Sequence, residues 1–375
     1  MRATFPESSP EEEPVQWCGF PAAEVEFGPA GELVGDRGAA VRELAGTPGV
    51  TDLVVLCHGW NDGHLVARLL CSALAGSMRS VGGAGRGIAL VCVLWPSRKT
   101  AGPDAGLPER LDLLRDLVPG QRLTIDAAAD LVPALPVRAT ARTAFAAALL
   151  SVATRGADDH EDASTQLFTL PGGTVMDRLG KAAATHLLDF LACYELKARA
   201  NEVGVRGLAP LLATSPGGPK IHLVGHSFGA RLVTAAAGAL PAGSLATLTL
   251  LQAAFSHFGF AADWGGGRAG VFRRVLDERV VRGPILVTHS AADFVVGVPY
   301  AIAARIGGAP YGAMGHDGAQ RTAEAVAAEL APVTGTYRWR PGVPHNLRAE
   351  RFVRGHTDVT GREIAHALCS AIAAR

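Results

Sequence analysis

The sequence predicts an α/β fold in which a mostly parallel central sheet is flanked by helices. Short continuous apolar runs, such as 53–57 and 88–94, are typical of strands that are buried on both faces. Between these two runs, apolar residues recur at helical spacing, so strand, helix and strand follow one another within about 45 residues. Such units build parallel sheets, and the same alternation returns from residue 221 to the end of the chain.

The expected elements follow from this alternation. Apolar runs predict five strands, at 53–57, 88–94, 221–224, 245–251 and 285–288. Helical spacing predicts one helix after the first strand and others near 108–117, near 139–153, from Lys181, over 228–238 and at the C-terminus. The last helix is expected to open with a capping box formed by Thr360 and Glu363.

The alternation stops between residues 98 and 179. This stretch contains several prolines, two helical fragments and a polar segment. We interpret it as a partly helical cap, inserted in a single domain that spans residues 17–375. Because it leaves the sheet at the carboxyl end of a strand, we expect it to lie over the ligand-binding edge of the sheet. Its pieces 111–117 and 145–152 would then present an apolar face to the substrate, and the inserted segment would set substrate choice. The alternative is a surface decoration that lies away from the site.

Length and composition exclude several classes of protein. The 375 residues can bury a large core, and a hydrophobic content of 48% excludes disorder of the whole chain. The 35 Lys and Arg residues balance the 35 Asp and Glu residues, so the basic field of a dedicated nucleic-acid-binding protein is lacking. No apolar run approaches the ~18–20 residues that a membrane-spanning helix requires. We therefore expect no nucleic-acid partner and no membrane span.

The amino terminus and the cysteines bear on location. Residues 1–16 are acidic and contain prolines where a signal peptide has its apolar run, and we expect them to form a loose leader. The six cysteines form no CxxC pair and no close cluster, which argues against a structural zinc site and against a disulfide scaffold. The expected location is cytoplasmic and reducing.

The strongest chemical signal is a Gly-x-Ser-x-Gly motif at the end of a predicted strand, Gly225-His226-Ser227-Phe228-Gly229. The glycines permit a turn so tight that the serine side chain is held up at the strand end. There the hydroxyl meets the N-terminus of the next helix, which favours a developing negative charge. A chance match is the alternative in a chain with 45 glycines, but the position between strand and helix favours a nucleophile.

A serine nucleophile needs a base to take its proton and a carboxylate to orient that base. Asp293 lies just after the predicted strand 285–288, at the edge of the sheet where ligands bind, and is the expected acid. An ordinary turn residue is the alternative interpretation of this aspartate. Asp263 is the alternative acid, since it follows the preceding strand at a greater distance along the chain.

The expected base is His356, which stands in a loop that leads into the last predicted helix. A histidine in such a loop can reach over the serine. His345 and His366 are weaker candidates, because one lies in a loop bordered by proline and the other inside the last helix.

Two backbone N–H groups are the expected donors to an oxyanion. One belongs to Phe228, directly after the serine. The other belongs to Trp60, in a His-Gly-Trp-Asn loop at the end of the first predicted strand. We expect His58 in this loop to form structural hydrogen bonds and not to carry protons.

These motifs together resemble the α/β-hydrolase superfamily. The resemblance rests on Cys-His-Gly-Trp at 57–60, the motif around Ser227, Asp293, and His-Thr-Asp-Val at 356–359. Leu-Trp-Pro-Ser at 94–97 and the His-Gly-Trp-Asn loop further resemble poorly characterised bacterial members of esterase and lipase type. The match covers about residues 50–97 and 180–375 and leaves the insertion aside. It implies a mostly parallel sheet of eight strands and hydrolysis through an acyl-enzyme.

The expected activity is therefore that of a serine hydrolase, which cleaves an ester or related acyl bond without a cofactor or a metal. Its substrate would be a small molecule with an apolar acyl or alcohol part. An acyltransferase or thioesterase would use the same triad with another acceptor or leaving group. A non-catalytic binding protein of this fold is the other alternative, although such a protein typically lacks one of the three triad residues that this chain contains.

Overall fold

The computed structural model describes residues 16–59, 63–83, 87–97, 105–153, 171–179, 182–213, 218–295 and 312–374. The strands of this part of the chain are β1 (Gln16–Trp17), β2 (Phe20–Glu26), β3 (Asp52–Cys57), β4 (Ile88–Leu94), β5 (Lys220–His226), β6 (Thr247–Leu251), β7 (Ile285–His289), β8 (Val326–Glu329) and β9 (Pro344–Arg348). They form one nine-stranded sheet in the order β1-β2-β4-β3-β5-β6-β7-β9-β8. Only β1 runs antiparallel to its neighbour.

The expected α/β architecture with a mostly parallel sheet flanked by helices is confirmed. All five strands predicted from apolar runs form, as β3 to β7. Strands β1, β2, β8 and β9 were not predicted, and the sheet of the described residues has nine strands where the resemblance implies eight. Gln16, expected in the leader, begins β1, while residues 1–15 lie outside the described residues.

The helices are α1 (Arg37–Gly46), α2 (His64–Ser80), α3 (Leu107–Leu117), α4 (Arg122–Ala129), α5 (Ala139–Val152), α7 (Gly172–Leu179), α8 (Ala183–Glu202), α9 (Ala209–Ala213), α10 (Phe228–Ala239), α11 (Arg274–Asp277), α13 (Met314–Asp317) and α14 (Arg362–Ile372). In the described part of the chain, none of them combines the length and the apolar character that crossing a bilayer demands.

The expected capping box of the last helix does not form. The N-cap of α14 is Gly361, and no side chain caps this end. Thr360 instead lies before the cap, where its carbonyl oxygen accepts a hydrogen bond of 2.6 Å from the Ser77 hydroxyl in α2. The contact with α2 therefore fixes how the chain enters α14.

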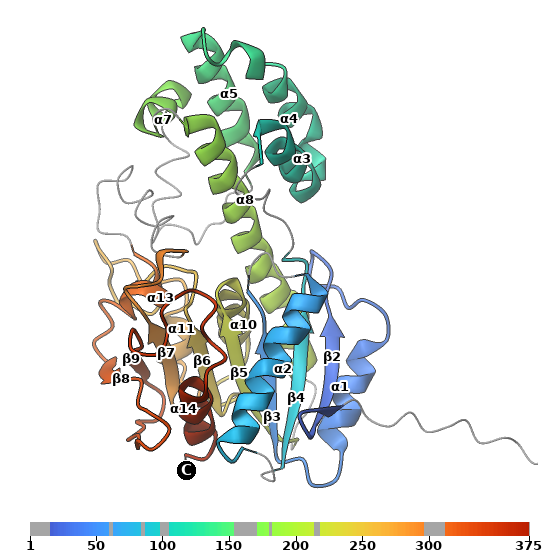
Figure 1. The fold of residues 1–375 in the computed structure, drawn as a ribbon, viewed down its shortest axis with the longest axis vertical. Helices are drawn as coiled ribbons and strands as arrows, with labels where there is room; N and C mark the ends of the chain where they lie inside the picture. The colour runs from blue at the N-terminus through green and yellow to red at the C-terminus, as the bar shows by residue number, and fades with distance from the viewer. Residues whose placement is uncertain are drawn as a thin grey trace, which may run out of the picture.

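The central strands bury both faces, as their continuous apolar runs predict. In β3, Leu53 and Val55 belong to the core cluster that includes residues of α1, α8 and α10. Val54 and Leu56 belong to the opposite cluster, which includes residues of α2 and α14. Figure 1 shows this arrangement, with α2 and α14 in front of the sheet. A sheet covered in this way presents its strand ends for binding and catalysis.

The helices α3, α4, α5, α7 and the first part of α8 form the cap, a lobe that stands above the rest of the molecule in Figure 1. The cap has its own core, which contains Leu111, Leu114, Phe145 and Leu149. These side chains come from the two pieces that were expected to face the substrate. They pack against one another instead, because the cap helices bury their apolar faces within the lobe.

Helix α8 joins the cap to the sheet domain. Leu187 and Leu191 pack in the cap core, whereas Leu196 and Ala200 pack in the core of the sheet domain. A helix of 20 residues is ~30 Å long, which is enough to pass through both cores. The cap therefore extends beyond the expected boundary at residue 179 into the middle of α8.

Candidate active site

The structure brings together Ser227, Asp293 and His356, which the sequence separates widely. The His356 Nε2 atom lies 2.8 Å from the Ser227 hydroxyl oxygen. The His356 Nδ1 atom lies 2.8 Å from the Asp293 Oδ2 atom. In a neutral ring, an Nδ1–H that donates to the carboxylate leaves Nε2 to accept the serine proton. We call these three hydrogen-bonded residues the triad.

Ser227 occupies the turn between β5 and α10. Its φ of 56° and ψ of −123° lie in a region that residues with a side chain rarely adopt. The neighbouring glycines are required by close backbone contacts, since a Cβ on Gly225 would lie 2.4 Å from the Gly229 oxygen and one on Gly229 2.3 Å from the His58 oxygen. The motif thus forms the strand–turn–helix junction that its sequence predicts.

The strained backbone of Ser227 leads to a prediction about stability. Ser227→Gly should unfold at a higher temperature than Ser227→Ala, because both variants lose the hydroxyl but only glycine adopts a φ of 56° without steric strain. The expected difference is about 1 kcal/mol in the free energy of unfolding. Urea denaturation of the two variants measures it. Equal stabilities would show that the turn carries no strain.

His226 is buried beside the triad and forms a hydrogen bond with the backbone of His356. Its Nε2–H donates to the His356 carbonyl oxygen at 2.8 Å. Burial, followed by the neighbouring His356 ring, lowers the pKa of His226 to about 3. A ring that stays neutral at physiological pH positions His356 and does not exchange protons with it.

His58 fastens the ends of β3 and β4 to each other. Its Nδ1–H donates to the Gly59 oxygen at 3.0 Å, and its Nε2 accepts the Trp95 backbone N–H at 3.4 Å. The Trp95 indole N–H in turn donates to the His58 oxygen at 3.1 Å. Burial lowers the pKa of His58 to about 4. The bonds fit the structural role that the sequence analysis expected.

These two buried rings predict a loss of stability in acid. Since the pKa values of His58 and His226 are near 4 and 3 in the folded protein and ~6.5 when unfolded, the unfolded state binds their protons first. The two neutral rings therefore contribute fully to the free energy of unfolding above pH 6.5, and this contribution is lost as the pH falls below 6.5. Each ring should lower the free energy of unfolding by about 2 kcal/mol at pH 5.

Urea denaturation at pH 7 and pH 5 tests this expectation. His58→Gln removes one titrating ring, so its free energy of unfolding should fall less steeply with pH than that of the wild type. Unchanged stability of the wild type between the two pH values would contradict the prediction.

Of the two expected oxyanion donors, only Phe228 lies among the described residues. Phe228 begins α10 directly after Ser227, so its N–H belongs to the first turn of that helix. Trp60 lies outside the described residues. The segment that leads to it runs beside Ser227, because a Cβ on Gly59 would lie 2.8 Å from the Ser227 Cβ. The role of Trp60 stays a prediction.

Asp293 is surrounded by polar partners that could not be predicted from the sequence. Asp293 is fully buried, and its Oδ2 accepts a second hydrogen bond of 3.1 Å from the Gln252 Nε2 atom. Its Oδ1 accepts the Val295 backbone N–H at 3.2 Å. The available signal was the position of Gln252, a polar residue directly after a buried strand at the same sheet edge as Ser227.

The other candidate residues have partners elsewhere. The Asp263 Oδ1 atom accepts three backbone N–H groups of its own loop, those of Gly265, Gly267 and Arg268. His345 bonds to the backbone of Arg340, and His366 to the oxygen of Gly335. These contacts are structural.

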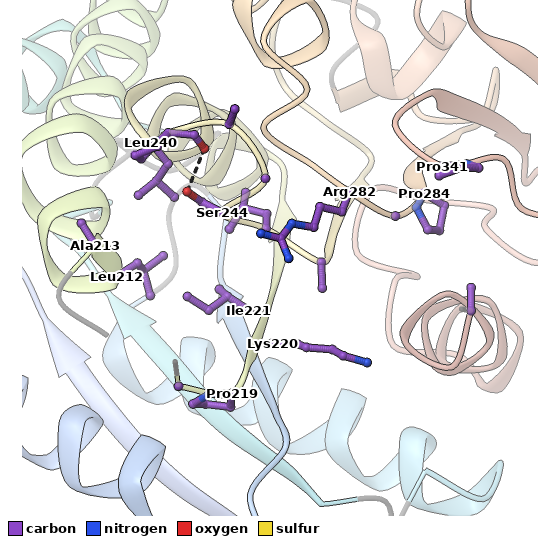
Figure 2. Close-up of a pocket in the computed structure, with 18 of the residues that line it drawn as sticks. Leu212, Ala213, Pro219, Lys220, Ile221, Leu240, Ser244, Arg282, Pro284 and Pro341 are labelled. Carbon is purple, nitrogen blue, oxygen red and sulfur yellow. Dashed lines mark hydrogen bonds between the residues drawn. The ribbon is translucent and has the colours of Figure 1, made fainter. Parts of the chain in front are cut away.

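A cavity of about 640 Å³ lies at the opposite edge of the sheet from the triad. Its walls include Lys220 at the start of β5, Ser244 before β6 and Arg282 before β7, as Figure 2 shows. Ser227 lies at the other end of β5, and no triad residue lines this cavity. The cavity is therefore separate from the triad.

The triad residues follow one another along the chain in the order serine, acid, histidine. Each lies beyond the carboxyl end of a strand, after β5, β7 and β9 respectively. Parallel strands bring these ends to one edge, which explains why residues so distant in sequence meet there. Comparison of the chain with protein-family models, curated proteins and solved structures finds no match to any of them.

Proposed function

We propose that this protein is a serine hydrolase of the α/β-hydrolase superfamily, which cleaves an ester or related acyl bond. The observation that carries the proposal is the pair of 2.8 Å contacts that link the Ser227 hydroxyl through His356 to Asp293. A serine hydroxyl is a weak nucleophile until a base removes its proton, and a buried carboxylate stabilises the imidazolium that results.

In the first half-reaction, the Ser227 oxygen attacks the substrate carbonyl carbon while its proton passes to the His356 Nε2 atom. The carbonyl oxygen becomes an oxyanion, which the N–H of Phe228 and the expected N–H of Trp60 stabilise. The tetrahedral intermediate then expels the alcohol, which takes the proton from Nε2. An acyl group remains bound to the serine.

In the second half-reaction, a water molecule attacks the acyl carbon. Its proton passes to Nε2, and the collapse of the second tetrahedral intermediate returns this proton to the Ser227 oxygen. The products are a carboxylic acid and the free enzyme. Asp293 keeps its negative charge throughout, because its role is to hold the Nδ1–H and to balance the imidazolium.

The surroundings of the acid support a substrate with an apolar part. Phe294, directly after Asp293, is 72% exposed, and Val295 is 51% exposed. Large apolar side chains so exposed beside a polar reaction centre are suited to contact an apolar acyl or alcohol group.

We also infer a cytoplasmic protein. No disulfide joins the six cysteines, which is the state expected in a reducing compartment; they are Cys18, Cys57, Cys71, Cys92, Cys193 and Cys369.

A fluorophosphonate probe tests the proposed function without knowledge of the natural substrate. Such a probe phosphonylates an activated serine, with loss of fluoride, and resembles the tetrahedral intermediate. We expect one adduct on the intact protein, and peptide mapping should place it on Ser227. Heat-denatured protein is the control and should not react. A native protein that takes up no probe, or takes it up at another serine, would contradict the proposal.

A further inference from the structure

Gln252 is held in a single conformation at the end of β6. The residue is fully buried, and its φ of 45° is unusual for a residue other than glycine. Its side-chain Nε2 donates to the Asp293 Oδ2 atom at 3.1 Å and to the Gly315 oxygen at 2.9 Å. Its Oε1 accepts the Thr288 hydroxyl at 3.0 Å. The carboxamide thus uses both N–H groups and its oxygen.

These partners permit only one orientation of the carboxamide. Turning it over would set its oxygen against the carboxylate of Asp293 and the carbonyl of Gly315, which are both acceptors. Thr288 fixes the other end, because its hydroxyl donates to Oε1 and its oxygen accepts the Gln252 backbone N–H at 3.1 Å. Gln252 is therefore a rigid donor aimed at the acid.

The oxygen that Gln252 contacts is the one that accepts the Nδ1–H of His356. Two donors on Oδ2 fix its direction more tightly than one. The carboxamide of Gln252 is also a neutral donor. A lysine or arginine at this position would compete with the imidazolium for the carboxylate charge, and a second carboxylate would have to share a proton with Asp293.

We propose that Gln252 is a positioning residue for the proposed hydrolase, which holds Asp293 so that His356 keeps its proton on Nδ1 and offers Nε2 to Ser227. The inference rests on the proposed function. Its chemistry is that of a neutral hydrogen bond to a buried carboxylate, which orients the charge and leaves it available to the imidazolium.

The test is the rate constant of fluorophosphonate labelling as a function of pH, in the full-length protein. Gln252→Met keeps the length of the side chain but has no donor. We expect it to react about ten- to a hundredfold more slowly, because a hydrogen bond to a charged group is lost. The pH below which labelling of this variant slows should be higher than in the wild type. A carboxylate with one donor fewer holds the imidazolium proton more strongly.

Gln252→Glu gives the second and sharper measurement. Its carboxyl group donates to Asp293 only while it is protonated, and two adjacent carboxyl groups keep one shared proton. We therefore expect the labelling rate constant of this variant to fall at the pH at which the two carboxyl groups lose their shared proton. Gln252→Met should show no such fall. Gln320→Met is the matched control, because Gln320 is an exposed glutamine whose Nε2 bonds to a backbone oxygen, and it should label as the wild type does.

The outcomes separate the two proposals. Failure of the wild type to label would contradict the proposed function. A wild type that labels, together with Gln252 variants that match its rate and pH profile, would overturn the role of Gln252. So would variants that are equally slow with unchanged pH profiles, since Gln252 would then only fill space. If Gln252→Met does not fold, the pH profile of Gln252→Glu decides.

Discussion

Ser227→Ala is expected to lose ester turnover by a factor of the order of 10⁶, together with all fluorophosphonate labelling. The variant has no oxygen to attack a carbonyl, so only substrate binding and oxyanion stabilisation remain. Its thermal midpoint should stay close to that of the wild type, because alanine keeps the Cβ and the same strained backbone and loses only the hydrogen bond to His356. Turnover of a short-chain aryl ester and thermal unfolding measure the two properties.

Ser244→Ala is the matched control for this variant. Ser244 lies in the cavity at the opposite edge of the sheet, where its hydroxyl bonds to the Pro241 oxygen at 2.7 Å. The same chemical change at this position should leave turnover intact. If Ser227→Ala retains full activity, the assignment of the nucleophile is wrong, and the proposed function with it.

The fold could be predicted where strands are buried on both faces. In β3 to β7 most side chains are buried, so each strand contains a short run in which apolar residues predominate. Strand β2 has no such run, because it contains Pro21 and Glu24. The Glu24 carboxylate is paired with Arg68 of α2 at 2.6 Å, a contact that the local sequence does not reveal.

In the cap, too, the local sequence does not reveal the tertiary contacts. Its helical fragments could be predicted from spacing, but not the direction in which their apolar faces point. Helix α5 carries alanines and leucines on several sides, and it packs against α4 and α7 and, further along the chain, against α8. Only the tertiary contacts show that Phe145 and Leu149 pack within the cap.

At the site, the positions of Ser227, Asp293 and His356 could be proposed because each follows a local signal: a motif, a strand end, a loop before a helix. Gln252 has no comparable signal. A glutamine after a strand is ordinary in sequence, and its importance depends on two residues, Thr288 and Asp293, that only the parallel pairing of β6 with β7 brings near it.

Asp293→Asn is expected to keep the fold and to lower turnover by about 10³–10⁴. The oxygen of the asparagine can take the place of Oδ2, where it accepts from His356 and Gln252. Its NH₂ group then faces the Val295 N–H, and the imidazolium loses its counter-charge. In the reverse orientation, the NH₂ group donates to Nδ1, so the proton moves to Nε2 and the ring can no longer accept the proton of the serine.

Asp263→Asn tests the alternative acid in the same assay. The Asp263 oxygen accepts backbone N–H groups of an exposed loop, and the carbonyl oxygen of asparagine can accept the same bonds. Turnover should therefore change by no more than about twofold, within the small effect typical of a surface substitution. If Asp263→Asn lost most of its turnover and Asp293→Asn only a little, the acid would have to be assigned to Asp263, in the loop after β6. The 2.8 Å contact between His356 and Asp293 would then need another explanation. Burial of a carboxylate costs free energy, and stabilisation of a charged imidazole ring would no longer offset that cost.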